Sequence, residues 1–359
     1  MKYRCSQILS QWLWLALLLL ALPCGSYAQS VTGVGFAPIE IPDPVNGGSM
    51  PGYVFYPSAP STAISWIGPY QLHAERGTAA IPGAKPMVVI SHGHGGSDLS
   101  HHDLAVYLAS HGFVVATLQH PKDNYKDTSG TGTAAVFIGR PIQVKATIDM
   151  LLHDSRWKPL IDPNKIGVAG FSAGGYTSLM LVGAVPRFDR IIGFCESHPN
   201  NENVCTAARE MTATLAERGM SAMQYLTGIQ DQLHRWGDTN DPRVKSAFAM
   251  SPWSMVFDNT GLASVNRPVY LYDGADDQFQ PIKYNILHAA PLIKTLVGIK
   301  LIPEAGHFVF LAPCSAELAK SAPRICADPM GVDRVAVHRQ INADALAFFR
   351  GTLHVDPEK

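Results

Sequence analysis

A serine at position 172 lies in a pattern of residues that can make a side-chain hydroxyl reactive. It is the third residue of Gly170-Phe-Ser-Ala-Gly174, a G-x-S-x-G pattern between an apolar segment and a helix-like one. The flanking glycines permit the strained backbone and the close packing of a sharp strand-to-helix turn. Such a turn exposes the hydroxyl, so Ser172 is a candidate nucleophile. Ordinary glycine-rich turns share this short pattern, so other residues must supply the partners of a nucleophile.

A serine nucleophile needs a base, and the base needs a carboxylate that orients it. His307 follows a glycine shortly after the apolar segment Lys300–Ile302 and is the best base among the 14 histidines. Three carboxyl groups share one loop after an earlier apolar segment: Asp273, Asp276 and Asp277. The place of Asp277 in that loop favours it as the acid, with Asp276 as the alternative. Ser172, Asp277 and His307 follow one another in the order of one known triad layout.

A transition state with a developing negative oxygen needs two backbone N–H donors. The residue after the nucleophile, Ala173, is expected to supply one, and His94 in the glycine-rich loop Ser91–Ser97 the other. Neighbouring histidines, among them His101 and His102, invite a metal interpretation. The glycines already have a role, however, so no metal is expected. Five residues beside these positions are candidates for the pocket wall: His92, Gly93, His120, Phe171 and Phe308.

The first 28 residues have the features of a cleaved secretory signal. Basic residues follow Met1, an apolar stretch covers Ile8–Leu22, and Ser26-Tyr-Ala28 offers small residues before a cleavage point. The apolar stretch is shorter than the roughly 20 residues that a membrane-spanning helix needs. We therefore expect a periplasmic or secreted protein that has no stable membrane insertion after cleavage, with residues 29–359 as its one domain.

Export changes what the cysteines can do. Two of the six lie in the signal, and an even number in an oxidising compartment suggests disulfides. Three pairings of the other four are possible. The local pairing, Cys195 with Cys205 and Cys314 with Cys326, is preferred because each pair closes a short polar loop.

Composition and periodicity indicate an α/β fold. The chain has 359 residues, 47% of them hydrophobic, and a net charge of −1, which gives no reason to expect nucleic acid as a partner. From residue 86, short apolar strands alternate with helices, which predicts a mostly parallel central sheet covered on both faces. A capping box at Ser100–Asp103 is expected to open a helix through Ser110. The expected strands are residues 52–57, 86–91, 113–118, 165–170, 244–251, 268–272 and 298–302.

Residues 193–243 interrupt this alternation. A polar loop, Glu196–Glu202, precedes two helical patterns, and apolar residues such as Leu226 and Ile229 share one face of the second. We interpret the segment as a helical insertion that lines or covers the site, with two ordinary surface helices as the alternative.

Several short motifs together resemble the exported dienelactone-hydrolase-like α/β-hydrolases, bacterial relatives of the platelet-activating-factor acetylhydrolases. The resemblance covers about residues 50–350 and implies an α/β-hydrolase fold with a Ser–Asp–His triad and no cofactor. Ser172, Asp277 and His307 match the motif positions. Dienelactone hydrolases themselves use a cysteine nucleophile, which argues against dienelactone as substrate. The motifs are Tyr56-Pro57, Ser91–Gly96, Leu108–Phe113, His120-Pro121, Arg140-Pro141, Gly170–Gly175, Cys195 with His198-Pro199, and Gly306–Leu311 with Cys314.

These observations predict a serine hydrolase that cleaves small carboxylic esters through an acyl-enzyme intermediate. A phospholipase or lipase acting on lipid acyl chains is the alternative, and cleavage of amides or aromatic diesters is a weaker variant. A non-catalytic binding protein on the same fold is a third reading, although such proteins usually lack a triad member. The acyl and alcohol groups and the oligomeric state are not specified by the sequence.

Overall fold

The central sheet positions every candidate residue of the site. The structure is a computed structural model that describes residues 32–233 and 235–355, so the predicted signal lies outside it. The sheet and a small hairpin consist of the strands β1 (Gly33–Pro42), β2 (Ser49–Ser58), β3 (Ser65–Ile67), β4 (Tyr70–Leu72), β5 (Glu75–Arg76), β6 (Lys85–Ser91), β7 (Val114–Leu118), β8 (Ile161–Phe171), β9 (Val244–Met250), β10 (Val269–Gly274) and β11 (Leu296–Ile302).

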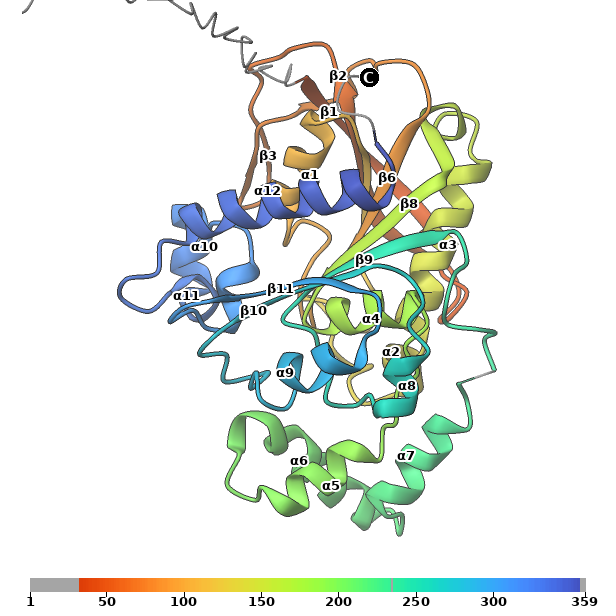
Figure 1. The fold of residues 1–359 in the computed structure, drawn as a ribbon, viewed down its shortest axis with the longest axis vertical. Coiled ribbons are helices and arrows are strands. Elements are labelled where there is room, and N and C mark those ends of the chain that lie inside the picture. The colour runs from red at the N-terminus through yellow and green to blue at the C-terminus, as the bar shows by residue number, and fades with distance from the viewer. Residues whose placement is uncertain (1–31, 234, 356–359) are drawn as a thin grey trace, which may run out of the picture. The chain divides into compact units, whose positions relative to one another are not determined.

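Within the described residues, nine strands form one sheet in the order β11-β10-β9-β8-β6-β7-β2-β1-β5, and β3 pairs with β4 (Figure 1). The six strands from β11 to β7 pair in parallel. Strand β2 is antiparallel to both β7 and β1. The prediction of a mostly parallel sheet in an α/β-hydrolase fold is confirmed.

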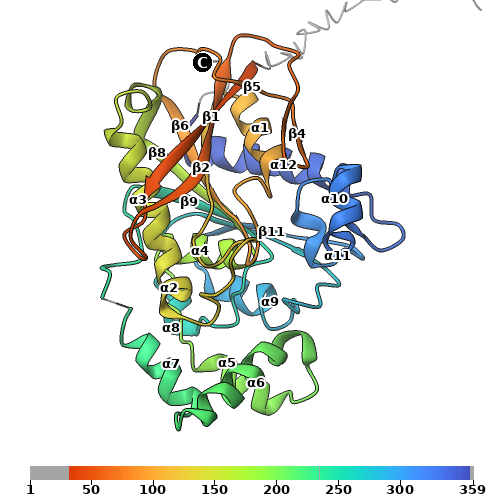
Figure 2. The same cartoon turned by 180° about the vertical axis from the view of Figure 1, so that it is seen from behind.

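Helices cover both faces of the sheet, as Figures 1 and 2 show from opposite sides. On β6, Met87 and Val89 join one core cluster, and Val88 and Ile90 join the other, because successive side chains of a strand point to opposite faces. The helices are α1 (His102–Ser110), α2 (Ala134–Phe137), α3 (Gly139–His153), η1 (Lys158–Leu160), α4 (Ala173–Leu181), α5 (Arg190–Ser197), α6 (Glu202–Glu217), α7 (Ala222–Gln230), α8 (Asn259–Ala263), α9 (Ile286–Ala289), η2 (Ala290–Leu292), η3 (His307–Phe310), α10 (Ala316–Ser321), α11 (Pro323–Cys326) and α12 (Arg334–Thr352).

The predicted capping box at the start of α1 is wrong. Helix α1 follows His101, and no side chain caps its first turn. The hydroxyl of Ser100 instead accepts the N–H of Ser97, at 2.9 Å. The carboxylate of Asp103 is held by His338 of α12, at 2.6 Å. Both side chains therefore make tertiary contacts where the local pattern predicted a cap.

Residues 190–230 form three helices, where the sequence predicted two after a polar loop. The first, α5, begins at Arg190 and includes the start of the expected loop. Helices α5, α6 and α7 lie together in both views (Figures 1 and 2). Leu226 and Ile229 of α7 are buried in the same core cluster as the strand residues. Helix α7 is therefore anchored to the main core.

The four described cysteines form the local pairing. Cys195 is bonded to Cys205, which ties α5 to α6, and Cys314 is bonded to Cys326. Among the described residues, none of the helices has the length and apolar character to cross a membrane.

Candidate active site

Ser172 lies at the turn between strand β8 and helix α4. Its backbone has φ 54° and ψ −114°, an unusual conformation for a residue with a side chain. Glycines make this turn sterically possible. A Cβ atom at Gly170 would lie 2.1 Å from the carbonyl oxygen of Gly174, and one at Gly174 would lie 1.9 Å from that of Ser91. The G-x-S-x-G pattern is thus required by close backbone approach.

The structure brings His307 and Asp277 to Ser172. The Nε2 atom of His307 lies 3.0 Å from the Ser172 Oγ, and its Nδ1 atom lies 2.6 Å from the Asp277 Oδ2. His307 begins η3 after strand β11, and Asp277 lies in the loop after β10. All three side chains are at least nine-tenths buried. This chain of hydrogen bonds can pass a proton from the serine hydroxyl to the imidazole.

The surroundings of Asp277 keep its carboxylate ionised. Its second oxygen accepts the N–H groups of Phe279 and Gln280, at 2.8 and 2.7 Å. Burial acts to raise the pKa of Asp277, but the bond from His307 and the other donors lower it below its ordinary value. An ionised carboxylate at this place can orient His307 and stabilise its protonated form.

The other two carboxyl groups of the loop have different surroundings. Asp276 is exposed to solvent, and the carboxylate hydrogen-bonded to His307 is that of Asp277. Asp273 is completely buried, and burial followed by the charge of Asp277 raises its pKa well above the ordinary value. The surroundings therefore disfavour the ionised form of Asp273 and favour that of Asp277, the carboxylate beside His307.

Sequence reasoning missed Ser251, which directly follows strand β9. Its hydroxyl donates a short hydrogen bond to the Asp277 Oδ2, and its Oγ lies 2.9 Å from the His307 Nδ1. The residue has φ 42°, so its backbone is strained as well. A signal was present: the predicted strand 244–251 ends beside the strand that leads to Ser172, at the same edge of a parallel sheet.

A buried arginine holds the glycine-rich loop against the sheet. Arg140 of α3 donates short hydrogen bonds to the His92 carbonyl oxygen and to Asp123. Its Nε also donates to the Thr177 hydroxyl of α4, at 3.3 Å. Burial acts to raise the pKa of Asp123, but the Arg140 guanidinium lowers it below its ordinary value. The other oxygen of Asp123 makes a short contact with the His94 ring. One ion pair therefore fixes the loop on both sides of Gly93.

The chain is similar to known hydrolases in part of its sequence and in its fold. Residues 75–235 match the dienelactone hydrolase family. The matched segment contains the glycine-rich loop and Ser172, and it ends before Asp277 and His307. A solved ferulic acid esterase from Streptomyces cinnamoneus shares 18% sequence identity at a TM-score of 0.59, over 91% of this chain and 92% of that one. At this identity the likeness shows the fold alone. No curated protein sequence matches the chain.

Two of the five pocket candidates lie in the interior. The His120 ring donates from Nδ1 to Gln143, at 2.7 Å, and lies 2.9 Å from the Ser91 hydroxyl. The Nε2 of His92 accepts the N–H of His120, at 3.0 Å. Burial lowers the pKa of His92 to about 3 and that of His120 well below its ordinary value. Both rings are therefore neutral supports of the loop, which differs from the expectation that they line a pocket.

Of the other three candidates, Phe171 and Phe308 lie beside the His307 ring, and Gly93 lies against Phe171. The Phe171 ring lies 4.7 Å from it and the Phe308 ring 5.4 Å, between ring centres. A Cβ atom at Gly93 would lie 2.9 Å from Phe171, so this glycine permits the loop to approach that ring. Phe279 adds a third aromatic neighbour, at 5.5 Å, that the sequence did not single out. Within the described residues, no group of His, Cys, Asp or Glu side chains is arranged to hold a metal ion.

Proposed function

We propose that this chain is a serine hydrolase that cleaves carboxylic esters through an acyl-enzyme intermediate. The observation that carries the proposal is the hydrogen-bonded series from Ser172 through His307 to Asp277. The strained turn at Ser172 and the match to the dienelactone hydrolase family support it independently.

In the proposed reaction the Ser172 Oγ attacks the ester carbonyl carbon, and its proton passes to the His307 Nε2. The Asp277 carboxylate stabilises the imidazolium that forms. The tetrahedral intermediate then collapses, and His307 returns the proton to the leaving alkoxide. A water molecule, deprotonated by His307, attacks the acyl-enzyme by the reverse route and releases the carboxylic acid with free Ser172.

The N–H groups of Ala173 and His94 are proposed to bind the oxyanion. Ala173 is the first residue of α4, so no carbonyl of its own helix can accept its N–H. His94 lies in the loop that Arg140 and Asp123 hold in place. Donors fixed before substrate binds need no reorganisation when the negative charge develops.

The test compares wild type with Ser172→Ala on p-nitrophenyl esters from acetate to palmitate. We expect short-chain activity that falls by roughly 10⁴-fold or more in the variant. A fluorophosphonate should label wild type and not the variant. Ser264→Ala, a change at an exposed serine of the α8 terminus, is the matched control and should behave as wild type. Full labelling or turnover in folded Ser172→Ala would refute the nucleophile.

The same series separates the substrate classes. A preference for long acyl chains would favour a lipase over an esterase of small substrates. Labelling without turnover of any ester would move the assignment to an amide or to a narrow substrate. A folded wild type that neither turns over nor becomes labelled would favour a binding protein.

We further propose that residues 1–28 direct export and are then removed. The two disulfides are compatible with an oxidising compartment outside the cytoplasm. Expression of the whole chain followed by mass spectrometry of the extracellular and periplasmic fractions tests this. We expect a mature protein that starts at Gln29, and recovery of the intact chain with Met1 only from the cytoplasm would contradict it.

A further inference from the structure

A second buried histidine lies behind the turn that carries His307. His338 belongs to α12 and is 5% exposed. Its Nδ1 atom lies 2.6 Å from the Asp103 Oδ2 of helix α1, and its Nε2 atom lies 2.8 Å from the carbonyl oxygen of Val309. Val309 is part of η3, two residues after His307. One imidazole thus connects α1, α12 and η3.

Both partners of His338 are hydrogen-bond acceptors. A carbonyl oxygen cannot donate. Asp103 is ionised, because burial raises its pKa by less than His338 and Asn342 lower it, and the pKa therefore lies below the ordinary value. Both ring nitrogens must therefore carry a proton for both bonds to form, which makes the ring an imidazolium. Burial acts to lower the pKa of His338, and the Asp103 carboxylate raises it above the ordinary value. The charge state that geometry requires is the one that the electrostatics favour.

The other ionisable groups near His338 leave this charge in place. His101 and His102 precede and begin α1, and burial lowers both pKa values, that of His101 to about 4, so both rings are neutral at pH 7. Arg334, one turn earlier on α12, is paired with Asp328 at 2.8 Å. Asp103 is therefore the anion that balances the imidazolium.

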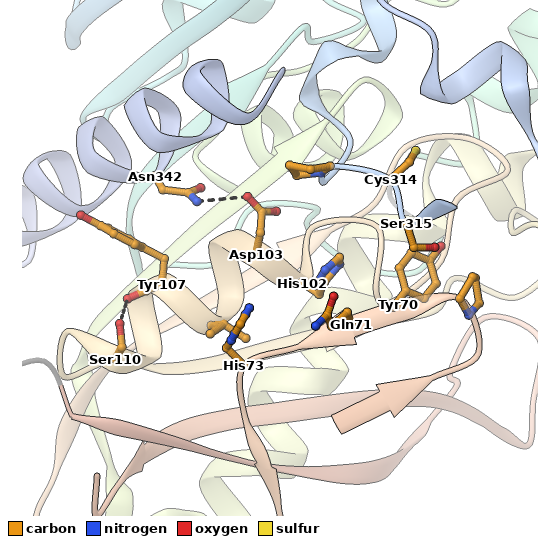
Figure 3. A pocket seen from close by; sticks show the side chains of 13 residues that line it. Tyr70, Gln71, His73, His102, Asp103, Tyr107, Ser110, Cys314, Ser315 and Asn342 are labelled. Carbon is orange, nitrogen blue, oxygen red and sulfur yellow. Dashed lines mark hydrogen bonds between the residues drawn. The ribbon is translucent and has the colours of Figure 1, made fainter. Parts of the chain in front are cut away.

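Figure 3 shows Asp103 of α1 and Asn342 of α12 facing each other, with the hydrogen bond between them. The Asn342 amide donates to the same Asp103 oxygen as His338 does, at 3.0 Å. Asp103 and Asn342 line a cavity of about 470 Å³ with Tyr70 and Tyr107. Ser172, Asp277 and His307 do not line this cavity. Asp103 therefore keeps some contact with solvent on the cavity side, whereas His338 is buried.

We propose that His338 is a positioning residue of the hydrolytic site: as a buried imidazolium held by Asp103, it fixes the one-turn helix that presents His307 to Ser172. This inference rests on the proposed function. The segment after η3 is held on the same side, since the N–H of Ala312 donates to the carbonyl oxygen of Ser100, at 3.0 Å. The Val309 bond therefore ties η3 itself to α12 and to Asp103.

His338→Gln tests the proposal, because glutamine carries no charge and its single amide cannot hold both acceptors as the ring does. We expect kcat to fall by about 10- to 100-fold with KM unchanged, since small misplacements of a catalytic group have effects of this size. His111→Gln is the matched control. His111 is a half-buried histidine at the end of α1 that bonds Tyr107 of its own helix, so this variant should keep the kcat of wild type.

The pH profile of kcat distinguishes positioning from a purely structural role. In wild type the Val309 bond is lost when His338 releases a proton, so kcat should have an alkaline limb that His338→Gln lacks. Asp103→Asn removes the anion and should move this limb to lower pH. If His338→Gln does not fold, the Asp103→Asn profile and the ring ¹⁵N shifts of His338 in wild type still decide, because an imidazolium and a neutral ring differ in those shifts.

Three results would overturn the inference. The first is a folded His338→Gln protein with the kcat of wild type. The second is a loss of activity in His338→Gln that equals the loss of fluorophosphonate-labelled protein, so that kcat per labelled site is unchanged. The third is a neutral His338 ring in wild type below pH 6.5, the ordinary pKa of histidine. Failure of the proposed function looks different, because wild type itself would then be inert to ester and fluorophosphonate.

Discussion

Two buried histidines of this protein have almost the same geometry toward an aspartate and different partners on the other side. His307 and His338 each donate from Nδ1 to a carboxylate oxygen at 2.6 Å. The far nitrogen of His307 faces the hydroxyl of Ser172, at 3.0 Å, whereas that of His338 faces the carbonyl of Val309, at 2.8 Å. The two histidines therefore differ mainly in the group that faces Nε2, which is the hydroxyl of Ser172 in one case and the carbonyl of Val309 in the other.

A hydroxyl can donate a hydrogen bond and a carbonyl cannot. Beside Ser172, a neutral His307 ring has a free lone pair on Nε2 and can receive a proton during reaction. Beside Val309, the His338 ring has to be charged before substrate arrives, and a proton that it released would break the contact. An Asp–His pair is thus not a catalytic element in itself. The partner of the second nitrogen decides whether it moves a proton or holds a structure.

Removing the charge of each aspartate in turn is expected to give the largest difference between the two histidines. Asp277→Asn should lower kcat by roughly 10⁴-fold, because an amide favours the wrong tautomer of the base and cannot stabilise its charge. Asp103→Asn removes a charge at the same distance from a histidine but should lower kcat far less, because His338 transfers no proton. Steady-state kinetics of both purified variants on one ester measures the two effects.

Equal losses of kcat in the two variants would contradict the distinction between His307, which transfers a proton, and His338, which fixes η3. Circular dichroism should accompany the kinetics, since both aspartates belong to hydrogen-bonded networks and Asp277 is buried. Fluorophosphonate labelling gives the fraction of competent sites. Only kcat per labelled site compares the two positions fairly.

The buried ion pair of Arg140 with Asp123 extends the contrast to a paired aspartate whose partner is not a histidine. Arg140→Met should lower the free energy of unfolding by about 3–5 kcal/mol, since it leaves the Asp123 carboxylate buried without its main partner. The double variant Arg140→Met/Asp123→Asn should recover part of that loss. Urea titration of the three proteins is the measurement, and a double variant less stable than Arg140→Met would contradict the explanation.

The approach of Ser172, His307 and Asp277 was predictable because each of the three residues is marked by a short local pattern. Ser172, Asp277 and His307 each follow a strand, and the order of these strand ends is visible in the chain. The choice between Asp276 and Asp277 needed the structure, because it depends on which side of one turn faces inward. Most of the sheet was predictable for the same reason. The exceptions are β1, whose ten residues pair with β2 although the segment contains glycine and proline, and the two-residue strand β5, which pairs with β1.

The pair formed by Asp103 and His338 was not predictable, because the two residues are distant in sequence and no local motif marks them as partners. Asp103 and His338 are 235 residues apart, and the local pattern assigned Asp103 to a helix cap. The rings of His92 and His120 were placed in the pocket because their backbone adjoins the site, but sequence does not tell which way such a ring points. In both cases the error concerned the direction of a side chain, and the element itself was correct.

Stability against pH gives a smaller test of the His338 side of the comparison. The folded-state pKa of His338 is raised above its unfolded value, so the stabilisation is complete below that unfolded value, about 6.5, and is lost as pH rises through the folded pKa. The difference in unfolding free energy between wild type and His338→Gln should therefore shrink as pH increases. Urea titrations at a series of pH values measure it, and a difference that grows with pH would exclude an imidazolium.

The smallest effect on activity is expected at Asp273, a carboxyl group with no histidine beside it. Burial and the charge of Asp277 raise its pKa, so above about pH 4 Asp273 binds more protons in the folded protein than in the unfolded one. Unfolding therefore releases a proton, and this term lowers stability as pH rises toward the folded pKa. Asp273→Asn has a similar shape and stays neutral, so kcat should remain close to wild type while the variant becomes the more stable protein at alkaline pH. Thermal unfolding of both proteins at pH 5 and pH 8 measures this, with the larger gain expected at pH 8. A loss of activity like that of Asp277→Asn would mean that Asp273 acts as an anion, and the contrast between carboxyl groups with and without a histidine would then fail.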